Sequence, residues 1–316
     1  MTFLAYYLHK LDPFIFHVTD TFGPRWYGMA YVSAFICGYA LLLWLSKRGY
    51  ADLPQKQVGD FITWAALFGV MLGGRLGYVL FYKPEMLRDP LSIFRVWEGG
   101  MSAHGGMLGL VLFTLYYARK HRLAWTNLGD NLCVAAPIGL FFGRCANFIN
   151  GELYGRATNV RWAMQFPKEL LDAPNSAEAE RAVAAAQAID PGINSPEAIL
   201  HAVQTNRHVV GALRPILTPR HPSQLYEALL EGVVLFAILW FVRTRTRQPN
   251  GVLTGLFFIC YAIFRIVVEN FREPDASLIG PFTRGQFFSF FLVLLGIAFI
   301  IVAKRRPVYP KNLAIS

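Results

Sequence analysis

The chain has 316 residues, of which 54% are hydrophobic, 15% aromatic and only 16% charged. A soluble domain carries about 25% charged residues, so this chain has too few charges to cover a soluble surface. The composition excludes a disordered chain, a collagen-like chain and a small disulfide scaffold, and it argues against an ordinary soluble enzyme. The net charge of +10 favours basic loops at an anionic membrane face over a nucleic-acid partner.

Seven apolar stretches are long enough to cross a bilayer, which takes roughly 20 mostly apolar residues. They lie near residues 27–46, 57–82, 101–118, 129–149, 223–242, 252–271 and 285–303. Residues 1–24 lack the apolar core and small-residue cleavage site of a signal peptide. The sequence therefore predicts an all-α polytopic membrane protein with about seven transmembrane helices.

Loop charge predicts the orientation of these helices. Short basic loops follow the first, third, fifth and seventh stretches, as in Lys47-Arg48 and Lys304-Arg305-Arg306. Because Lys and Arg are enriched in cytoplasmic loops, we expect a cytoplasmic C-terminus and an N-terminus on the outer side. An odd number of spans agrees with this arrangement.

The long segment between the fourth and fifth stretches predicts a small head on the outer, periplasmic side. Three parts are expected: residues 1–150 with four helices and an outer N-terminal arm, residues 151–221 as the head, and residues 222–316 with three helices and a cytoplasmic tail. Within the head, Asp190-Pro191-Gly192 is a turn signal between two expected short helices.

The sequence predicts no metal site and no cofactor. The four cysteines, Cys37, Cys133, Cys145 and Cys260, show no CxxC or CxxH spacing, and no His, Asp and Glu set has metal-ligand spacing. No glycine-rich nucleotide loop is present either.

Ionisable side chains inside the apolar stretches are costly and therefore indicate function. They include Arg75, Arg144, Glu227, Glu231, Arg265 and Glu269. Arg144, Asn147 and Gly151 follow the i, i+3, i+7 spacing of one helical face, and Glu152 and Gly155 come shortly after. Either Arg144 reaches out to the membrane interface, or this cluster lines a polar pocket.

A second polar stripe has the i, i+4, i+8, i+11 spacing of one helical face. It consists of Tyr261, Arg265, Glu269 and Arg272. Arg265 and Glu269 can form an internal ion pair at this spacing. Glu269 can also orient Arg265 so that its guanidinium binds a phosphate bidentately.

Two further candidates lie at the outer ends of their stretches. His104 stands among glycines and is either a hydrogen-bonded structural residue or a general base. Tyr27 lies at interface depth, where aromatic side chains are common without any catalytic role. Because all these polar clusters lie near the outer side, we expect a cationic, water-poor pocket for an anionic lipid headgroup.

These residues resemble one family. The run Gly143–Gly155 matches the signature Gly-Arg-x-(Gly/Ala)-Asn-Phe-x-Asn-x-Glu-x-x-Gly of bacterial phosphatidylglycerol–prolipoprotein diacylglyceryl transferases. The blocks at residues 102–106, 221–227 and 264–275 are also similar to that family, as is the expected seven-span layout. The resemblance covers nearly the whole chain, and residues 171–207 look like an insertion.

The resemblance implies an enzyme of the bacterial inner membrane with its active site toward the outer leaflet. Its substrates would be phosphatidylglycerol and a preprolipoprotein signal peptide with a lipobox cysteine. The diacylglyceryl group would move to the cysteine thiol, a thioether would form and glycerol 1-phosphate would leave. This is the first step of lipoprotein maturation, and it needs no cofactor.

The resemblance also assigns roles to residues. The catalytic residues would be His104, Arg144 and Arg265, with both arginines on the phosphate and His104 as base or positioning group. The substrate-binding residues would be Tyr27, Asn147, Glu152, Gly155, Tyr261, Glu269 and Arg272.

Two other classes of protein remain as alternatives. A transporter for an organic anion would carry polar residues near the bilayer centre, whereas here they crowd the outer halves. A structural membrane protein would not need the Arg-Asn-Asn-Glu run beside a histidine on a neighbouring helix.

Overall fold

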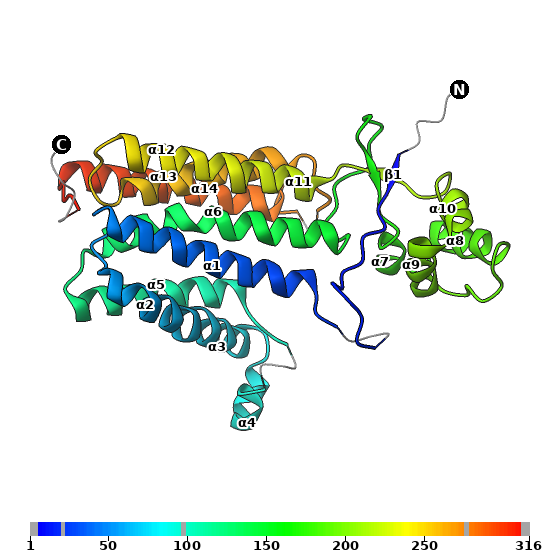
Figure 1. The fold of residues 1–316 in the computed structure, drawn as a ribbon, viewed down its shortest axis with the longest axis horizontal. Coiled ribbons are helices and arrows are strands. Elements are labelled where there is room, and N and C mark those ends of the chain that lie inside the picture. The colour runs from blue at the N-terminus through cyan, green and yellow to red at the C-terminus, as the bar shows by residue number, and fades with distance from the viewer. Residues whose placement is uncertain (1–5, 20–22, 96–98, 275–277, 311–316) are drawn as a thin grey trace. The chain divides into compact units, whose positions relative to one another are not determined.

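The computed structural model describes residues 6–19, 23–95, 99–274 and 278–310, and most of them are helical (Figure 1). The chain divides into two compact units. The first contains Met1–Phe35, Pro137–Ala237 and Phe258–Leu294, and the second contains Ile36–Ala136, Ile238–Phe257 and Leu295–Ser316. Asp275, the last residue of the block at 264–275, lies outside the described residues.

Within the described residues, six helical segments are long and apolar enough to cross a membrane. They confirm the predicted multi-pass membrane protein. Single helices are α1 (Trp26–Lys47), α6 (Trp125–Ile149), α13 (Val252–Glu269) and α14 (Arg284–Arg305). Gln55–Phe81 joins η1 (Gln55–Gln57), α2 (Val58–Trp64), the π-helical η2 (Ala65–Met71) and α3 (Leu72–Phe81). Ser223–Arg245 joins α11 (Ser223–Glu227), the π-helical η5 (Ala228–Val234) and α12 (Leu235–Arg245).

The described residues contain six candidate spans, where the sequence predicts about seven. The expected third span is a helix, α5 (Ala103–His121), but it is less apolar than the other six. Its 19 residues include His104 and several glycines, and its last turn carries Arg119, Lys120 and His121. These residues lower its hydropathy below that of a typical spanning helix.

In the second unit, α5 packs tightly on the helix that contains α3. A Cβ atom at Gly73 would lie 2.7 Å from the carbonyl oxygen of Gly105 and 2.8 Å from the Cα of Gly109. A Cβ at Gly105 would lie 2.8 Å from the Cα of Gly77. Small residues thus let the two backbones approach closely. Ser102 caps α5, because its hydroxyl accepts a hydrogen bond from the Gly105 N–H at 3.1 Å.

Arg75 is used to hold a loop of the second unit. This loop contains η3 (Pro84–Arg88) and α4 (Pro90–Ile93). The guanidinium donates to the carbonyls of Ser92, Ile93, Arg95, Gly99 and Gly100. Arg75 is only 4% exposed, and its N–H groups donate to main-chain oxygens and not to a ligand.

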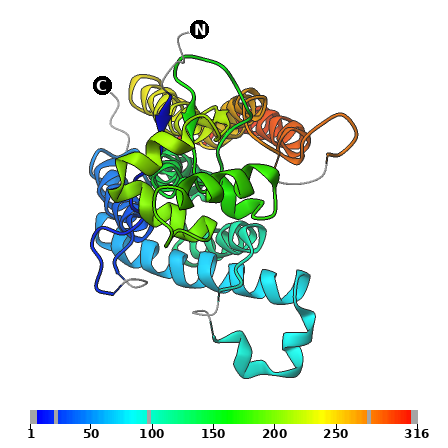
Figure 2. The same ribbon diagram turned by 90° about the vertical axis from the view of Figure 1, so that its right-hand side faces the viewer.

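The head belongs to the first unit and is built on a small sheet that the sequence did not predict. The strand β1 (Tyr7–Leu8) runs parallel to β2 (Met164–Gln165), which is antiparallel to β3 (Pro219–Arg220). In Figure 1 the helices of the head lie beside β1, and Figure 2 shows them grouped at the front of the view.

The helices of the head surround a core of their own. They are α7 (Glu169–Asp172), α8 (Ala177–Gln187), α9 (Pro196–Thr205) and α10 (Arg207–Leu213). Buried side chains from α8 to α10, among them Ala182, Ile199 and Leu213, pack together with Leu8 of β1. The two helices and the turn expected around Asp190 are present as α8 and α9, and the Asp190 carboxylate accepts from the Gly192 N–H at 2.9 Å.

His9 follows β1 directly and is buried among aromatic rings. Its ring centroid lies 5.4 Å from those of Phe148 and Phe166, and a Cβ at Gly151 would lie 3.1 Å from its Nδ1 atom. Burial lowers the pKa of His9 from its ordinary 6.5 to about 4.

We therefore expect the protein to lose stability as the pH falls from about 6.5 to about 4. In that range the unfolded chain takes up a proton at His9 and the folded chain does not, which costs up to about 3 kcal/mol. Thermal unfolding in detergent across this range should show a smaller loss for His9→Phe than for the unchanged protein. The matched variant His208→Phe removes an exposed histidine of α10 and should leave the loss unchanged. Parallel pH profiles for His9→Phe and the unchanged protein would contradict this account.

Candidate active site

Glu227 is the centre of a buried ion-pair cluster in the first unit. It is the last residue of α11, and its side chain is 0% exposed. One carboxylate oxygen accepts from Arg265 at 2.8 Å and from Arg272 at 2.9 Å. The other lies 2.9 Å from the Nε atom of Arg144. One carboxylate therefore connects arginines from α6, α13 and the segment after α13.

Two more carboxylates complete the cluster. Glu269 pairs with Arg265 at 3.0 Å, one helical turn apart on α13, so the predicted internal pair is present. Glu231 lies in η5 and is 0% exposed. Its oxygens are 3.6 Å from Arg144 and 3.9 Å from Arg265, too far for hydrogen bonds but within range of strong electrostatic attraction.

Glu227 and Glu231 are four residues apart in the same helical segment, and both carboxylates face Arg144. Glu227 precedes the π-helical segment η5, and Glu231 lies inside it. π-Helical turns are rare and occur frequently at functional sites. Close packing also holds this segment, because a Cβ at Gly232 would lie 2.7 Å from the Cβ of Phe141 on α6.

The cluster is not the purely cationic pocket that the sequence suggested. Three arginines face three carboxylates, so their charges balance when all are ionised. Burying charges in a bilayer is expensive, and this balance makes the cost tolerable. The Arg144 and Arg265 side chains stay 17% and 14% exposed, whereas Glu227 and Glu231 are fully buried. The accessible part of the cluster is therefore guanidinium.

The sequence shows Glu227 and Glu231 only as charges inside a span, and it does not predict that they bind the arginines. The available signal was the pair of glutamates at i, i+4 in an apolar stretch, which requires cationic partners on other helices. The sequence could not identify those partners, because the contacts join residues up to 87 positions apart, as in Arg144 and Glu231.

The loop after α6 is held by very close backbone contacts at Gly155. A Cβ there would lie 2.4 Å from the carbonyl oxygen of Phe271 and 2.7 Å from the carbonyl oxygen of His221. The Gly155 N–H donates to the His221 carbonyl, and the Arg156 N–H donates to the Phe271 carbonyl, both at 2.8 Å. Only glycine fits this position without moving the main chain.

The block at residues 221–227 fixes the same loop from its other side. The Ser223 hydroxyl donates to the Leu153 carbonyl at 2.9 Å, and the Gln224 amide donates to the Glu152 carbonyl at 2.7 Å. Both side chains are fully buried. The block thus carries Glu227 into the ion-pair cluster while its first residues bind the loop 152–156.

Asn147 and Glu152 form a separate polar group. The Asn147 amide donates to the Glu152 carboxylate at 2.8 Å, and Lys168 approaches the same carboxylate at 3.4 Å. The expected helical face of Arg144, Asn147 and Gly151 is shorter than predicted. α6 ends at Ile149, and Gly151 has a φ of +64°, which lies in the left-handed region that favours glycine.

Arg220 supports the loop at Gly155 from the head and was not predicted. It pairs with the buried carboxylate of Glu169 on α7 and with Glu273 at 3.3 Å. One of its N–H groups donates to the Gly155 carbonyl at 3.4 Å, and the guanidinium lies 4.8 Å above the Tyr154 ring.

The other predicted site residues lie as follows. Tyr261 is half-buried on α13, one turn before Arg265. Tyr27 lies in the first turn of α1 and packs against Tyr31, with ring centroids 5.4 Å apart. His104 belongs to the second unit, where it is exposed in the first turn of α5, so its role at the arginines stays a prediction.

Fold and site together define a multi-pass membrane protein with a buried cluster of arginines and glutamates. The sequence comparisons assign it more narrowly. The chain belongs to the prolipoprotein diacylglyceryl transferase family, whose family model matches residues 13–302.

Several curated relatives are similar over almost their full length, and all carry the name phosphatidylglycerol–prolipoprotein diacylglyceryl transferase. The chain is 38% identical to the protein of Bdellovibrio bacteriovorus, with 94% of each chain covered. It is 42% identical to the protein of Geobacter sulfurreducens, over 95% of this chain and 98% of the relative. It is 40% identical to the protein of Azospirillum brasilense, over 96% and 98%.

The contacts of Gly155 predict that Gly155→Ala destabilises the protein by about 1–3 kcal/mol, because the added methyl group forces the loop away from Phe271 and His221. The matched variant Gly143→Ala adds a methyl group on α6 where nothing lies within 4 Å. It should be neutral or slightly stabilising, since alanine favours helix. Thermal unfolding midpoints of the two variants in detergent check this prediction. Equal midpoints would show that the close approach at Gly155 does not affect the free energy of unfolding.

Proposed function

We propose that this chain transfers the diacylglyceryl group of phosphatidylglycerol to the thiol of the lipobox cysteine in a prolipoprotein, and that Arg144 and Arg265 hold the phosphate. The observation that carries the assignment of the arginines is their shared anchor, Glu227, to which both are bound while their own edges stay partly exposed. An anion that enters from the exposed side meets guanidinium groups already fixed in place.

The chemistry requires stabilisation of charge on a leaving phosphate. The cysteine sulfur, as thiolate, attacks the glyceryl carbon that carries the phosphate ester. The carbon–sulfur bond forms, the carbon–oxygen bond breaks and glycerol 1-phosphate leaves with the electron pair. Fixed donors in a site with little water stabilise this developing charge without reorganising. Glycerol 1-phosphate is itself a good leaving group, so no metal or organic cofactor enters the proposal.

The thiol proton needs an acceptor, and His104 is the candidate. Histidine titrates near neutrality and suits a general base. Alternatively, the arginines lower the pKa of the bound thiol and His104 only positions a substrate. Its exposed side chain in the first turn of α5 is accessible to a substrate in either role.

The remaining predicted residues would shape the headgroup pocket. Asn147 and Glu152, already hydrogen-bonded to each other, present amide and carboxylate groups for the glycerol hydroxyls. Gly155 would contribute indirectly, by holding the loop that carries Glu152 against the backbones of His221 and Phe271. Tyr27 and Tyr261 would line the pocket, and Glu269 and Arg272 keep Arg265 and Glu227 in place.

For the membrane arrangement we propose the bacterial inner membrane, with the N-terminus and the head periplasmic and the C-terminus cytoplasmic. The six candidate spans and an embedded α5 together give the odd number that this orientation needs. The basic last turns of α1, α5, α12 and α14 would then face the cytoplasm. The division at residues 150 and 221 into two membrane parts and a head is part of the same proposal.

The phosphate role predicts that Arg144→Lys and Arg265→Lys each lower transfer by about 100-fold or more, because lysine keeps the charge but lacks the bidentate fork. The measurement is glycerol phosphate release and the mass shift of a lipobox peptide, with purified protein and phosphatidylglycerol in detergent. Arg181→Lys, an exposed substitution on α8, is the matched control and should retain full activity. Near-normal transfer by both arginine variants would remove the phosphate clamp from the mechanism.

A further inference from the structure

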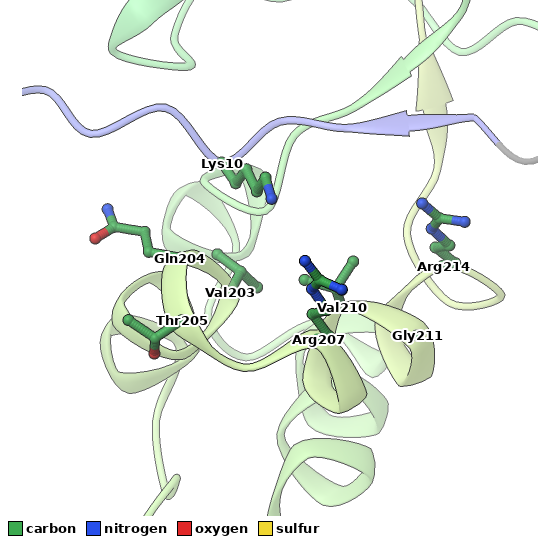
Figure 3. A pocket seen from close by; sticks show the side chains of 8 residues that line it. All are labelled: Lys10, Val203, Gln204, Thr205, Arg207, Val210, Gly211 and Arg214. Carbon is green, nitrogen blue, oxygen red and sulfur yellow. The ribbon is translucent and has the colours of Figure 1, made fainter.

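The head contains a basic cavity that the proposed reaction does not use. Its volume is about 650 Å³, and it is lined by eight residues from the N-terminal segment, the end of α9 and α10. Figure 3 shows Lys10, Arg207 and Arg214 among the side chains around this hollow. The volume lies in the range of small-molecule sites, about 300–1,000 Å³.

The charge of this cavity is unbalanced. Its lining contains Lys10, Arg207 and Arg214 and no acidic residue. Across the part of the chain that the structure describes, no carboxylate lies within 4.0 Å of these three cations, whereas Lys168 and Arg220 of the same unit are paired with glutamates. Three unneutralised positive charges around one hollow concentrate anions there.

The spacing of α10 directs both arginines to the cavity. Arg207 begins α10 and Arg214 caps its C-terminal end with helical backbone angles. Their spacing of seven residues, about two helical turns, places them on one face with Val210 and Gly211. The opposite face carries Val209 and Leu213, which are buried in the core of the head. The arginines are thus held on the accessible side by the packing of their own helix.

Gly211 lines the hollow beside Arg207 and Val210. A Cβ at this position would meet nothing within 4 Å. A larger side chain at this position would therefore extend into the open space of the cavity.

A single buried residue fixes the walls of the cavity relative to each other. The Gln165 main-chain carbonyl accepts from the His9 N–H at 2.8 Å, next to Lys10. The Gln165 side-chain amide donates to the Arg214 carbonyl at 2.7 Å and to the Leu217 carbonyl at 2.6 Å. Asn206 caps the other end of α10 by accepting from the His208 N–H at 2.9 Å. Hydrogen bonds therefore hold the backbone next to Lys10, at Arg214 and at the start of α10 in place.

From this geometry we infer that the cavity of Lys10, Arg207 and Arg214 binds a phosphate-bearing anion. A phosphate group offers oxygens in several directions, which suits cations that approach from two different segments, and arginine binds it bidentately. The phosphate can belong to a lipid headgroup or to a free phosphate ester. The inference is independent of the proposed reaction, since none of these residues takes part in it.

The test is equilibrium binding of labelled glycerol 1-phosphate to the full chain in phosphatidylcholine nanodiscs at low salt. Arg207→Gln and Arg214→Gln should each weaken binding to the head by about tenfold, the loss expected for one hydrogen bond to a charged group. Gly211→Leu should abolish it by filling the hollow without changing the charge. Arg181→Gln removes an exposed arginine of the head that does not line the cavity, and it should change the affinity less than about twofold.

The same assay distinguishes binding of glycerol 1-phosphate at the active site from binding in the cavity of the head. Binding that persists in Arg144→Lys and is lost in Gly211→Leu belongs to the cavity, and the cavity variants should retain lipid transfer. The inference is overturned if the three cavity variants bind like the unchanged protein, or if Arg181→Gln weakens binding as much as Arg207→Gln does.

Two further arms identify the source of the phosphate. If phosphatidylglycerol in the nanodisc competes with glycerol 1-phosphate for the cavity, the occupant is a lipid headgroup. If it does not compete, the occupant is a free phosphate ester, and both results agree with the inference. An acidic peptide without phosphate that binds the cavity more tightly than glycerol 1-phosphate would contradict the phosphate assignment.

Discussion

The site depends on one buried carboxylate. Glu227 accepts from Arg265 and Arg272 and pairs with Arg144, so a single side chain sets the positions of three cations from three segments. Removing such a partner leaves arginines buried without compensation, which typically costs about 3–5 kcal/mol. The cluster thus links stability to function, since the groups that would bind phosphate are those that hold α6, α11 and α13 together.

The hydrogen bonds around the ion-pair cluster hold the loop 152–156 in place. Ser223 and Gln224 fix the loop 152–156 by donating to its carbonyls, and Gly155 lets that loop touch the backbones of His221 and Phe271. The residues 221–227 therefore connect the loop to the ion-pair cluster. Gly155 itself contacts the backbone of Phe271, which directly precedes Arg272 of the cluster.

Much of the fold follows from the sequence because membrane helices need long apolar stretches, and those are visible in one dimension. The candidate arginines were predicted for the same reason: charges are rare in such stretches. Two features were not predictable. The strands around Gln165 have two residues each, too few for an alternating pattern. The pairing of Arg144 with Glu227 joins segments 83 residues apart, which no local spacing encodes.

The central claim is that Glu227 orients the arginines and does not itself bind the lipid. The most direct test compares kcat and KM for phosphatidylglycerol between the unchanged protein and Glu227→Gln, with Glu273→Gln as a control at a half-exposed glutamate. Removing the carboxylate leaves the cluster with an additional positive charge, so we predict an unchanged or lower KM with a fall in kcat of about 100-fold. Glu273→Gln should alter neither constant. An unchanged kcat in Glu227→Gln, or a loss confined to KM, would contradict the account.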